Sequence, residues 1–149
     1  MAGPILNTPI TVVQGSDEVR TFSFFTQPTG GSTDVQDLVP VNFTGCTARM
    51  QVRATANPGG TAYLSLAGGA GVSGSSPSGI AFIAETFSPG PPLPGSPNGF
   101  TVTVSKEKSL AMNGGQPGIF YYDLILDWTN GTSTVYLRGQ FTLQGSATR

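Results

Sequence analysis

The sequence predicts an all-β protein, an antiparallel β-sandwich or barrel with one short helix. About seven or eight short segments alternate between apolar and polar residues, as half-buried strands do. Turn-forming residues separate these segments. Glycine and proline supply 21 and 12 of the 149 residues, and much of that excess falls in two stretches that are expected to be long loops. The length matches one ordinary core, so residues 1–149 are expected to form a single domain.

The first part of the chain is expected to contain an extended arm and a β-hairpin. Residues 1–8 are too few to fold alone and form the arm. Residues 9–14 and 19–25 have strand character, and a turn of glycine, serine, aspartate and glutamate separates them. So short a connection predicts that the two strands pair with each other. Residues 26–40 are expected to be a loop.

The clearest alternation lies in residues 46–53. Every second side chain is apolar and points to one face, whereas the intervening positions are polar and include Arg49 and Arg53. This pattern is typical of a strand that is buried on one side only. Cys46 falls on the apolar face, so it is expected to be a small buried hydrophobe rather than a reactive thiol. Residues 61–66 form a shorter strand of the same kind.

Two long loops flank a strand in the middle of the chain. Residues 67–78 are a glycine- and serine-rich stretch with almost nothing to bury. Residues 86–98 contain five prolines, so they cannot be a central strand, because proline lacks the amide donor of the ladder. This Pro-rich loop is expected to sample polyproline II and to stand off the surface. The strand between the two loops covers residues 79–85.

The last third is expected to begin with a strand and the short helix. In residues 100–104 the apolar positions alternate, which indicates a strand. Residues 105–112 are expected to form a helix of about two turns, because Ser105 is a suitable N-cap and Glu107 sits favourably in the first turn.

A β-hairpin is expected to end the fold. The Asn130-Gly131 pair is the best hairpin signal in the chain, because both residue types tolerate the positive φ of a tight turn. The first strand covers residues 119–128 and the second covers residues 134–143, with Gly139 as a bulge or bend. The inward side chains of the second strand are expected to be Val135, Leu137, Phe141 and Leu143.

The composition excludes several kinds of chemistry. The chain has no histidine, which removes histidine-based catalytic triads and the commonest metal ligand. A single cysteine excludes an internal disulfide and a multi-cysteine zinc site. Only seven lysines and arginines and a net charge of −1 argue against a nucleic-acid partner. No segment has the pattern of a signal peptide or a membrane span. We therefore expect no enzymatic activity, no metal, no cofactor and no membrane partner.

Three motif matches have ordinary interpretations. The G-x-G-x-x-G run at residues 69–74 precedes Ser-Ser-Pro-Ser-Gly, which cannot open the helix that a dinucleotide site requires. The S-x-x-K run at Ser105 lacks the companion motifs of penicillin-recognising enzymes, so a capped helix start is favoured. Asp123 and Asp127 are about 13 Å apart along one strand, which exceeds the spacing of a glycosidase pair. They are expected on a solvated face.

Candidate interaction residues lie in the arm and in the Pro-rich loop. Only 10% of the residues are charged, so the surface is expected to be neutral or covered by a partner. Pro4, Ile5 and Leu6 of the arm are expected to pair with or dock on an adjacent subunit. Leu93 lies at the centre of the Pro-rich loop, which enters a bound state already stiff. Residues 144–149 are expected to be a flexible tail.

Arginines and aromatic residues form a second candidate set. Arg49, Arg53 and Arg138 are expected to share a face and to form salt bridges, either within the fold or across an interface. Trp128 and Tyr121 leave two alternatives open. They could form an exposed aromatic platform, or they could pack under the hairpin or a neighbouring molecule.

Residues 42–53, Asn-Phe-Thr-Gly-Cys-Thr-Ala-Arg-Met-Gln-Val-Arg, resemble a recurring element of small tailed-bacteriophage and prophage virion proteins. In those proteins the element follows an N-terminal hairpin, whose counterpart here is Ile-Thr-Val-Val-Gln-Gly-Ser-Asp at residues 10–17. Similar domains form the N-terminal part of phage baseplate upper proteins, so the resemblance implies an immunoglobulin-like β-sandwich. Shorter matching pieces are residues 79–83, 100–105, 122–126 and 137–143.

The resemblance implies a non-enzymatic structural protein of the virion, assembled in the host bacterial cytoplasm. The chain differs from baseplate upper proteins because it stops after the sandwich and carries two long insertions, which argues against host recognition. The first hypothesis is a capsid decoration (cement) protein on the particle surface. Its partners would be the major capsid protein or other virion proteins, together with further copies of itself as a homo-oligomer. The second hypothesis is a tail, neck or baseplate adaptor of low copy number. The third is a carbohydrate-binding or adhesion module, by analogy with other β-sandwiches.

Overall fold

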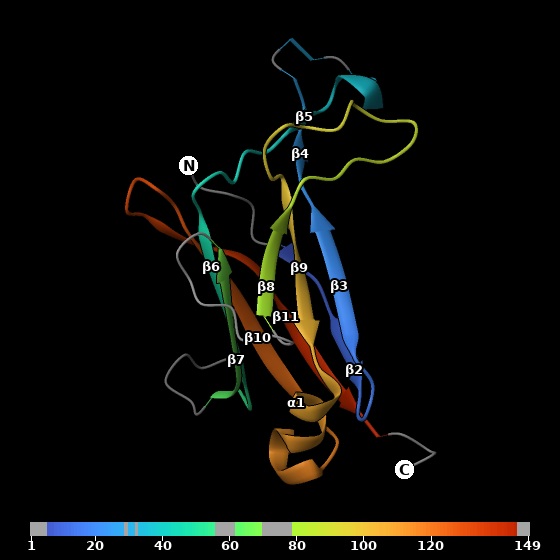
Figure 1. Cartoon of the computed structure of the whole chain (residues 1–149), viewed down its shortest axis with the longest axis vertical. Coiled ribbons are helices and arrows are strands. Elements are labelled where there is room, and N and C mark those ends of the chain that lie inside the picture. Colours follow the sequence, from blue (N-terminus) through green and yellow to red (C-terminus); the bar gives the residue numbers. More distant parts are fainter. Residues whose placement is uncertain (1–5, 29, 32, 56–61, 70–78, 146–149) are drawn as a thin grey trace.

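A computed structural model describes residues 6–28, 30–31, 33–55, 62–69 and 79–145 of the chain. Strands account for 52% of the structure and helices for 11%, so the protein is all-β, as the alternation of the sequence predicts. Within the described residues, eleven strands form two main sheets and one small two-stranded ribbon (Figure 1). No helix in this part of the chain has the length and apolar character needed to cross a membrane.

The larger sheet has six strands. The order is β1-β11-β10-β6-β7, and β2 also pairs with β11. Both β1 and β2 run parallel to β11, whereas the other neighbours are antiparallel. The strands of this sheet are β1 (Leu6–Asn7), β2 (Ile10–Val13), β6 (Thr47–Arg53), β7 (Ala62–Gly69), β10 (Gly118–Asp127) and β11 (Ser133–Gln144).

The smaller sheet has three antiparallel strands in the order β3-β9-β8 and faces the larger one (Figure 1). Its strands are β3 (Glu18–Ser23), β8 (Gly79–Ile83) and β9 (Gly99–Val104). The sheets approach closely where β7 meets β8. A Cβ on Gly68 of β7 would lie 1.6 Å from the carbonyl oxygen of Ile80 on β8, so this crossing point has room only for glycine.

Short elements close the two ends of the molecule (Figure 1). At the end that we call the loop end lie the Pro-rich loop and the β4-β5 ribbon, which joins Phe25–Thr26 to Val39–Pro40, with the 3-10 turn η1 (Val35–Asp37) between those strands. At the opposite end, the helix end, lie α1 (Lys106–Ala111) and the 3-10 turn η2 (Met112–Gly115).

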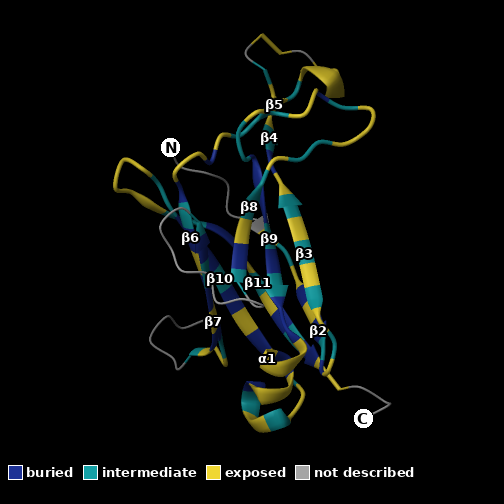
Figure 2. Cartoon of the chain, in the orientation of Figure 1, coloured by how far each residue is buried: buried dark blue, intermediate teal, exposed yellow. Residues whose placement is uncertain are grey.

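The core lies between the facing sides of the two sheets. Along β6 the residues Ala48, Met50 and Val52 are buried, and along β9 Phe100 and Val102 are buried. Figure 2 shows buried and exposed residues alternating along the strands, as expected for sheets with one dry and one wet face. The predicted inner faces of residues 46–53 and 100–104 are therefore confirmed.

Phe43 lies at the centre of this core although it belongs to no strand. Its side chain is 1% exposed and its backbone N–H donates to the carbonyl of Pro97 at 2.8 Å. Ring centroids of five other aromatic residues lie between 5.6 and 6.1 Å from its own. These partners come from both sheets and from the segments beside them: Phe24, Phe82, Phe100, Trp128 and Tyr136.

The predicted hairpin between residues 9–14 and 19–25 is wrong. The two segments are strands, but β2 pairs with β11 of the larger sheet and β3 pairs with β9 of the smaller one. The connection is held at the helix end, because the amide of Gln14 donates to the carbonyl of Gly115 at 3.0 Å and the N–H of Gly15 donates to Ser109 Oγ at 3.0 Å. The chain therefore crosses from one sheet to the other at this turn.

The C-terminal hairpin forms as predicted, but its bulge lies elsewhere. Leu124 pairs with Leu137 and Ile125 pairs with Val135, so Tyr136 is the extra residue. Tyr136 and Leu137 are consequently both buried, whereas Val135, which was expected to face the core, is only half-buried on the outer side.

Gly139, the predicted bulge, instead stays in register with Tyr122. It leaves room for the N-terminal strands, because a Cβ there would lie 2.5 Å from the carbonyl oxygen of Thr8.

The helix begins as the sequence predicts. Ser105 Oγ accepts a hydrogen bond from the N–H of Lys108 at 3.3 Å, which is the N-cap contact. Asp17 adds a second contact, since its carboxylate accepts from the N–H of Lys106 at 2.8 Å. The S-x-x-K run is thus a capped helix start that is tied to the β2-β3 turn.

Phe43→Ala is expected to lower the free energy of unfolding by about 3–5 kcal/mol, because it empties the centre of the aromatic core. Urea unfolding followed by Trp128 fluorescence measures the loss. Phe87→Ala is the matched control, since its ring is 42% exposed, and it should cost less than about 1.5 kcal/mol. Equal losses in the two variants would contradict the central position of Phe43.

Candidate functional site

The outer face of the six-stranded sheet carries most of the polar side chains that the sequence singles out. The registers of β6, β10 and β11 place these side chains in rows across the sheet. One row is Arg53-Tyr121-Gln140, and the next is Gln51-Asp123-Arg138. Two further rows follow toward the hairpin turn, Arg49-Ile125-Val135 and Thr47-Asp127-Ser133. Successive rows are about 7 Å apart, which is two residues of strand rise.

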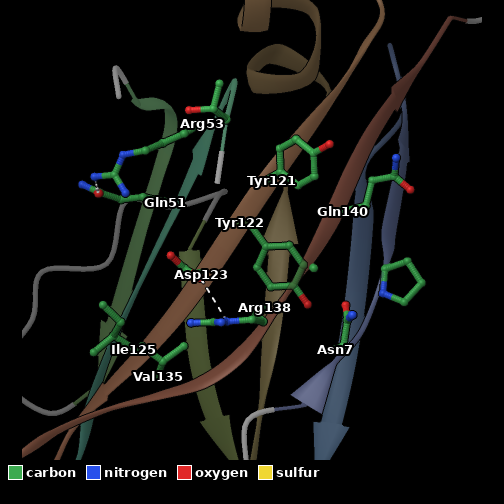
Figure 3. Close-up of a pocket in the computed structure, with 13 residues that line it drawn as sticks. Asn7, Gln51, Arg53, Tyr121, Tyr122, Asp123, Ile125, Val135, Arg138 and Gln140 are labelled. Carbon is green, nitrogen blue, oxygen red and sulfur yellow. Dashed lines mark hydrogen bonds and ion pairs between the residues drawn. The ribbon is translucent and has the colours of Figure 1, made fainter. Parts of the chain in front are cut away.

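The first three rows contribute to a hollow of about 860 Å³ on this face (Figure 3). We call it the outer hollow. Asn7 and Pro9 border it on the side of the N-terminal strands, and Arg53 and Thr55 border it on the side of β6. The full lining is Asn7, Pro9, Gln51, Arg53, Thr55, Tyr121, Tyr122, Asp123, Ile125, Val135, Arg138, Gly139 and Gln140.

Two of the three arginines on this face, Arg49 and Arg138, form ion pairs within the fold. Salt bridges within the fold were one of two expected alternatives, and salt bridges across an interface were the other. Arg49 Nε lies 3.1 Å from Asp127 Oδ2, and Arg138 Nε lies 3.8 Å from Asp123 Oδ1. Arg53 contacts the side-chain oxygen of Gln51 on its own strand. The two aspartates therefore lie on the exposed face and serve as partners of arginines.

Two neighbours hold the Asp127 carboxylate beside the hairpin turn. Its oxygen Oδ1 accepts a hydrogen bond from Ser133 Oγ at 2.6 Å. That hydrogen bond, together with Arg49, lowers the pKa of Asp127 against the opposing effect of partial burial. The lowered pKa indicates that the contacts of Asp127 with Ser133 and Arg49 stabilise the fold beside the hairpin turn. Asp127 does not line the outer hollow.

Trp128 does not form an exposed platform. Its ring packs against Phe43 and Tyr136 at centroid distances of 5.8 and 6.2 Å, and its indole N–H donates to Thr134 Oγ1 at 3.1 Å. Tyr121 differs, because its side chain is 42% exposed and lines the outer hollow. The structure thus separates the two aromatic residues that the sequence left as alternatives.

The loop end presents a second candidate surface. Leu93 is 64% exposed in the middle of the Pro-rich loop, and Val35, Val39 and Phe87 are also exposed at this end. The Phe87 ring packs edge-on against Phe25 at 5.3 Å, which connects the loop to β4.

Buried hydrogen bonds hold the base of the Pro-rich loop. The side chain of Asn98, which is fully buried, accepts from the N–H of Glu85 at 2.7 Å and donates to its carbonyl at 2.9 Å. Thr86 Oγ1 donates to the carbonyl of Pro91 at 2.6 Å, and Pro91 is itself buried. Part of the loop therefore folds onto the molecule, while Leu93 remains outside.

The arm residues divide between the described and the undescribed parts of the chain. Pro4 and Ile5 lie outside the described residues, as do residues 70–78 and 146–149. Leu6 begins β1, and its backbone pairs with Leu137 of the same chain. The edge of β11 beside Leu137 is therefore occupied by the chain's own N-terminus.

Three other titratable side chains, those of Cys46, Tyr122 and Tyr136, are buried in the core. Cys46 is a buried free thiol, and burial raises its pKa. Burial likewise raises the pKa values of Tyr136 and Tyr122, and a nearby negative charge on Asp123 adds to the effect on Tyr122. The Tyr122 hydroxyl donates to the carbonyl of Thr8 at 2.6 Å. In the described ranges, no group of three or more histidine, cysteine, aspartate or glutamate side chains is arranged to hold a metal ion.

Comparison with known proteins gives no family assignment. No protein-family model matches the chain, and no curated protein matches it.

Sequence reasoning missed the outer hollow itself. The sequence pattern singles out Arg53, Arg138 and Tyr121, but the places of Gln51 and Gln140 in two adjacent rows follow only from the pairing of three strands. The alternation in residues 46–53 and 119–128 does place these side chains on solvated faces. It contains no information on which solvated residues become neighbours.

Ser133→Ala is expected to raise the pKa of the Asp127 carboxyl, because it removes the strongest contact that lowers it. NMR titration of the carboxyl measures this directly, and an unchanged pKa would contradict the assignment.

Asp127→Asn is expected to cost about 0.5–1 kcal/mol of stability at pH 7, as an exposed pair does. A carboxyl whose folded pKa is lowered stabilises the fold above its unfolded value of about 3.9, and this stabilisation is lost as the pH falls through the folded value. Urea unfolding should therefore show the difference between wild type and variant shrinking in acid.

Proposed function

We propose that the two facing sheets form an immunoglobulin-like β-sandwich. In that fold, strands B, E and D share one sheet, and strands G, F, C and C′ share the other. The order β3-β9-β8 corresponds to the first set, and the order β11-β10-β6-β7 corresponds to the second. The chain has a single cysteine, so it lacks the disulfide between sheets that antibody domains carry. An aromatic core around Phe43 occupies the space between the sheets instead.

We further propose that the protein is a non-enzymatic structural component of a bacteriophage particle, a capsid decoration protein. The observation that carries this proposal is the apolar loop end. Large apolar side chains that remain exposed at one end of a small domain favour an interaction site. The resemblance of residues 42–53 to an element of phage virion proteins supplies the class of partner, which is the major capsid protein or another virion protein.

The charge of the loop end supports a partner surface of opposite charge. Residues 24–45 and 84–98 contain no lysine or arginine, whereas they include Asp34, Asp37 and Glu85. A complementary surface would offer an apolar patch with a basic rim, since complementary charges favour docking. The buried contacts at the base of the Pro-rich loop hold it in place before binding, which reduces the entropy lost on association.

Leu93→Asp is expected to reduce binding of the purified protein to particles at least tenfold, because it places a charge in the apolar contact. Co-sedimentation with particles that lack the protein measures binding, and the native protein should bind less tightly as salt is raised. Ile119→Asp is the matched control, because Ile119 is 58% exposed at the start of β10, shortly after the 3-10 turn η2 of the helix end. Equal losses in both variants would remove the loop end from the proposed interface.

Imaging of purified particles tests the proposed position. A decoration protein is expected as many copies that follow the capsid lattice around local symmetry axes. Density for this chain on the tail or neck alone, at low copy number, would replace the decoration role with that of an adaptor. Particles that lack the chain altogether would overturn both.

A further inference from the structure

Tyr121 is the most distinctive residue of the outer hollow. Tyr121 is 42% exposed on β10, the middle strand of the larger sheet, so much of its surface remains available for contact. Its direct neighbours are Arg53 on β6 and Gln140 on β11, and all three line the hollow (Figure 3). The row thus places one aromatic ring between two long side chains that carry hydrogen-bonding groups.

The adjacent row adds groups that both donate and accept hydrogen bonds. Gln51 offers an amide, Asp123 a carboxylate and Arg138 a guanidinium, and Asp123 and Arg138 are already oriented toward each other at 3.8 Å. A hydroxyl group needs partners of both kinds, because it donates one hydrogen bond and accepts others. The two rows therefore suit a ligand with many hydroxyl groups and at least one apolar face.

We infer that the outer hollow is a carbohydrate-binding site for a short oligosaccharide. A pyranose ring has an apolar face of C–H groups that can stack on Tyr121, and its hydroxyl groups can reach Gln51, Asp123, Arg138 and Gln140. The volume of about 860 Å³ is within the range of about 300–1,000 Å³ that is usual for small-molecule sites. The aliphatic side chains of Ile125 and Val135 complete the lining.

Other ligand classes fit the lining less well. Its charged residues are Arg53, Arg138 and Asp123, which leave a net charge of +1, too little to track the phosphates of a nucleic acid. A single carboxylate is too few for a divalent cation. The mixture of tyrosine rings, side-chain amides and one ion pair favours a largely neutral, hydroxyl-rich ligand.

The inference goes beyond the proposed virion role and does not depend on it. The hollow lies on the outer face of the six-stranded sheet, whereas the proposed docking surface lies at the loop end. A particle-bound copy could use the two surfaces at once, and the failure of either proposal would leave the other in place.

The first test is a glycan array probed with the purified protein of residues 1–149. We expect binding to at least one oligosaccharide, followed by a calorimetric titration with that oligosaccharide that gives a millimolar or lower dissociation constant. Absence of binding to every oligosaccharide on the array would overturn the inference.

Substitutions then locate the site. Tyr121→Ala should weaken binding at least tenfold, whereas Tyr121→Phe, which keeps the ring, should stay within about threefold of wild type. Tyr63→Ala is the matched control, because Tyr63 is 40% exposed but does not line the hollow. Thermal unfolding of each variant shows whether it is folded. Unchanged binding in a folded Tyr121→Ala variant would overturn the inference.

A pair of arginine variants gives an independent test. Arg53→Gln removes a charged group of the hollow and should weaken binding, whereas Arg49→Gln alters the ion pair with Asp127 outside it and should not. Weaker binding in Arg49→Gln alone would place the sugar nearer the hairpin turn and would overturn the assignment to the outer hollow.

Discussion

The packing of aromatic rings around Phe43 is the interaction on which the rest of the structure depends. Phe43 precedes β6 and belongs to no strand, yet it contacts rings from both sheets and donates a backbone hydrogen bond to Pro97 of the Pro-rich loop. One side chain thus connects the two sheets to each other and to the loop end. Neither sheet can shift relative to the other without breaking these ring contacts, because interiors are closely packed.

This fixed core has consequences on the outside of the molecule. The bulge at Tyr136 turns two consecutive side chains of β11 inward, where Tyr136 joins the Phe43 cluster. Val135 is moved to the outer face by the same shift, and it lines the outer hollow beside Ile125. The shape of the proposed carbohydrate site is therefore linked to the packing of the aromatic core on the opposite side of the sheet.

Much of the fold could be predicted from the sequence, but little of the candidate site. Alternation located the strands at residues 46–53, 100–104 and 119–128, because a half-buried strand must repeat every two residues. Ser105 marked the helix start for an equally local reason. A short turn brings two strands close together in the sequence, but it does not require them to form hydrogen bonds with each other. The hairpin predicted near the N-terminus is wrong for this reason. Contacts of Gln14 with the distant helix end decided that question.

By itself, the sequence determined where most of the longer strands lie, most of their apolar faces, where the C-terminal hairpin turns and that histidine chemistry is absent. It assigned residues 67–69 to a loop, whereas they form the end of β7. Only the tertiary structure decided that Phe43 is central, that Trp128 packs against the core and that Tyr121 lies beside Arg53 and Gln140. The physical reason is the range of the interactions. Burial of one strand face, capping and turns depend on residues close in sequence, whereas strand partners and outer rows depend on contacts between residues far apart in the chain.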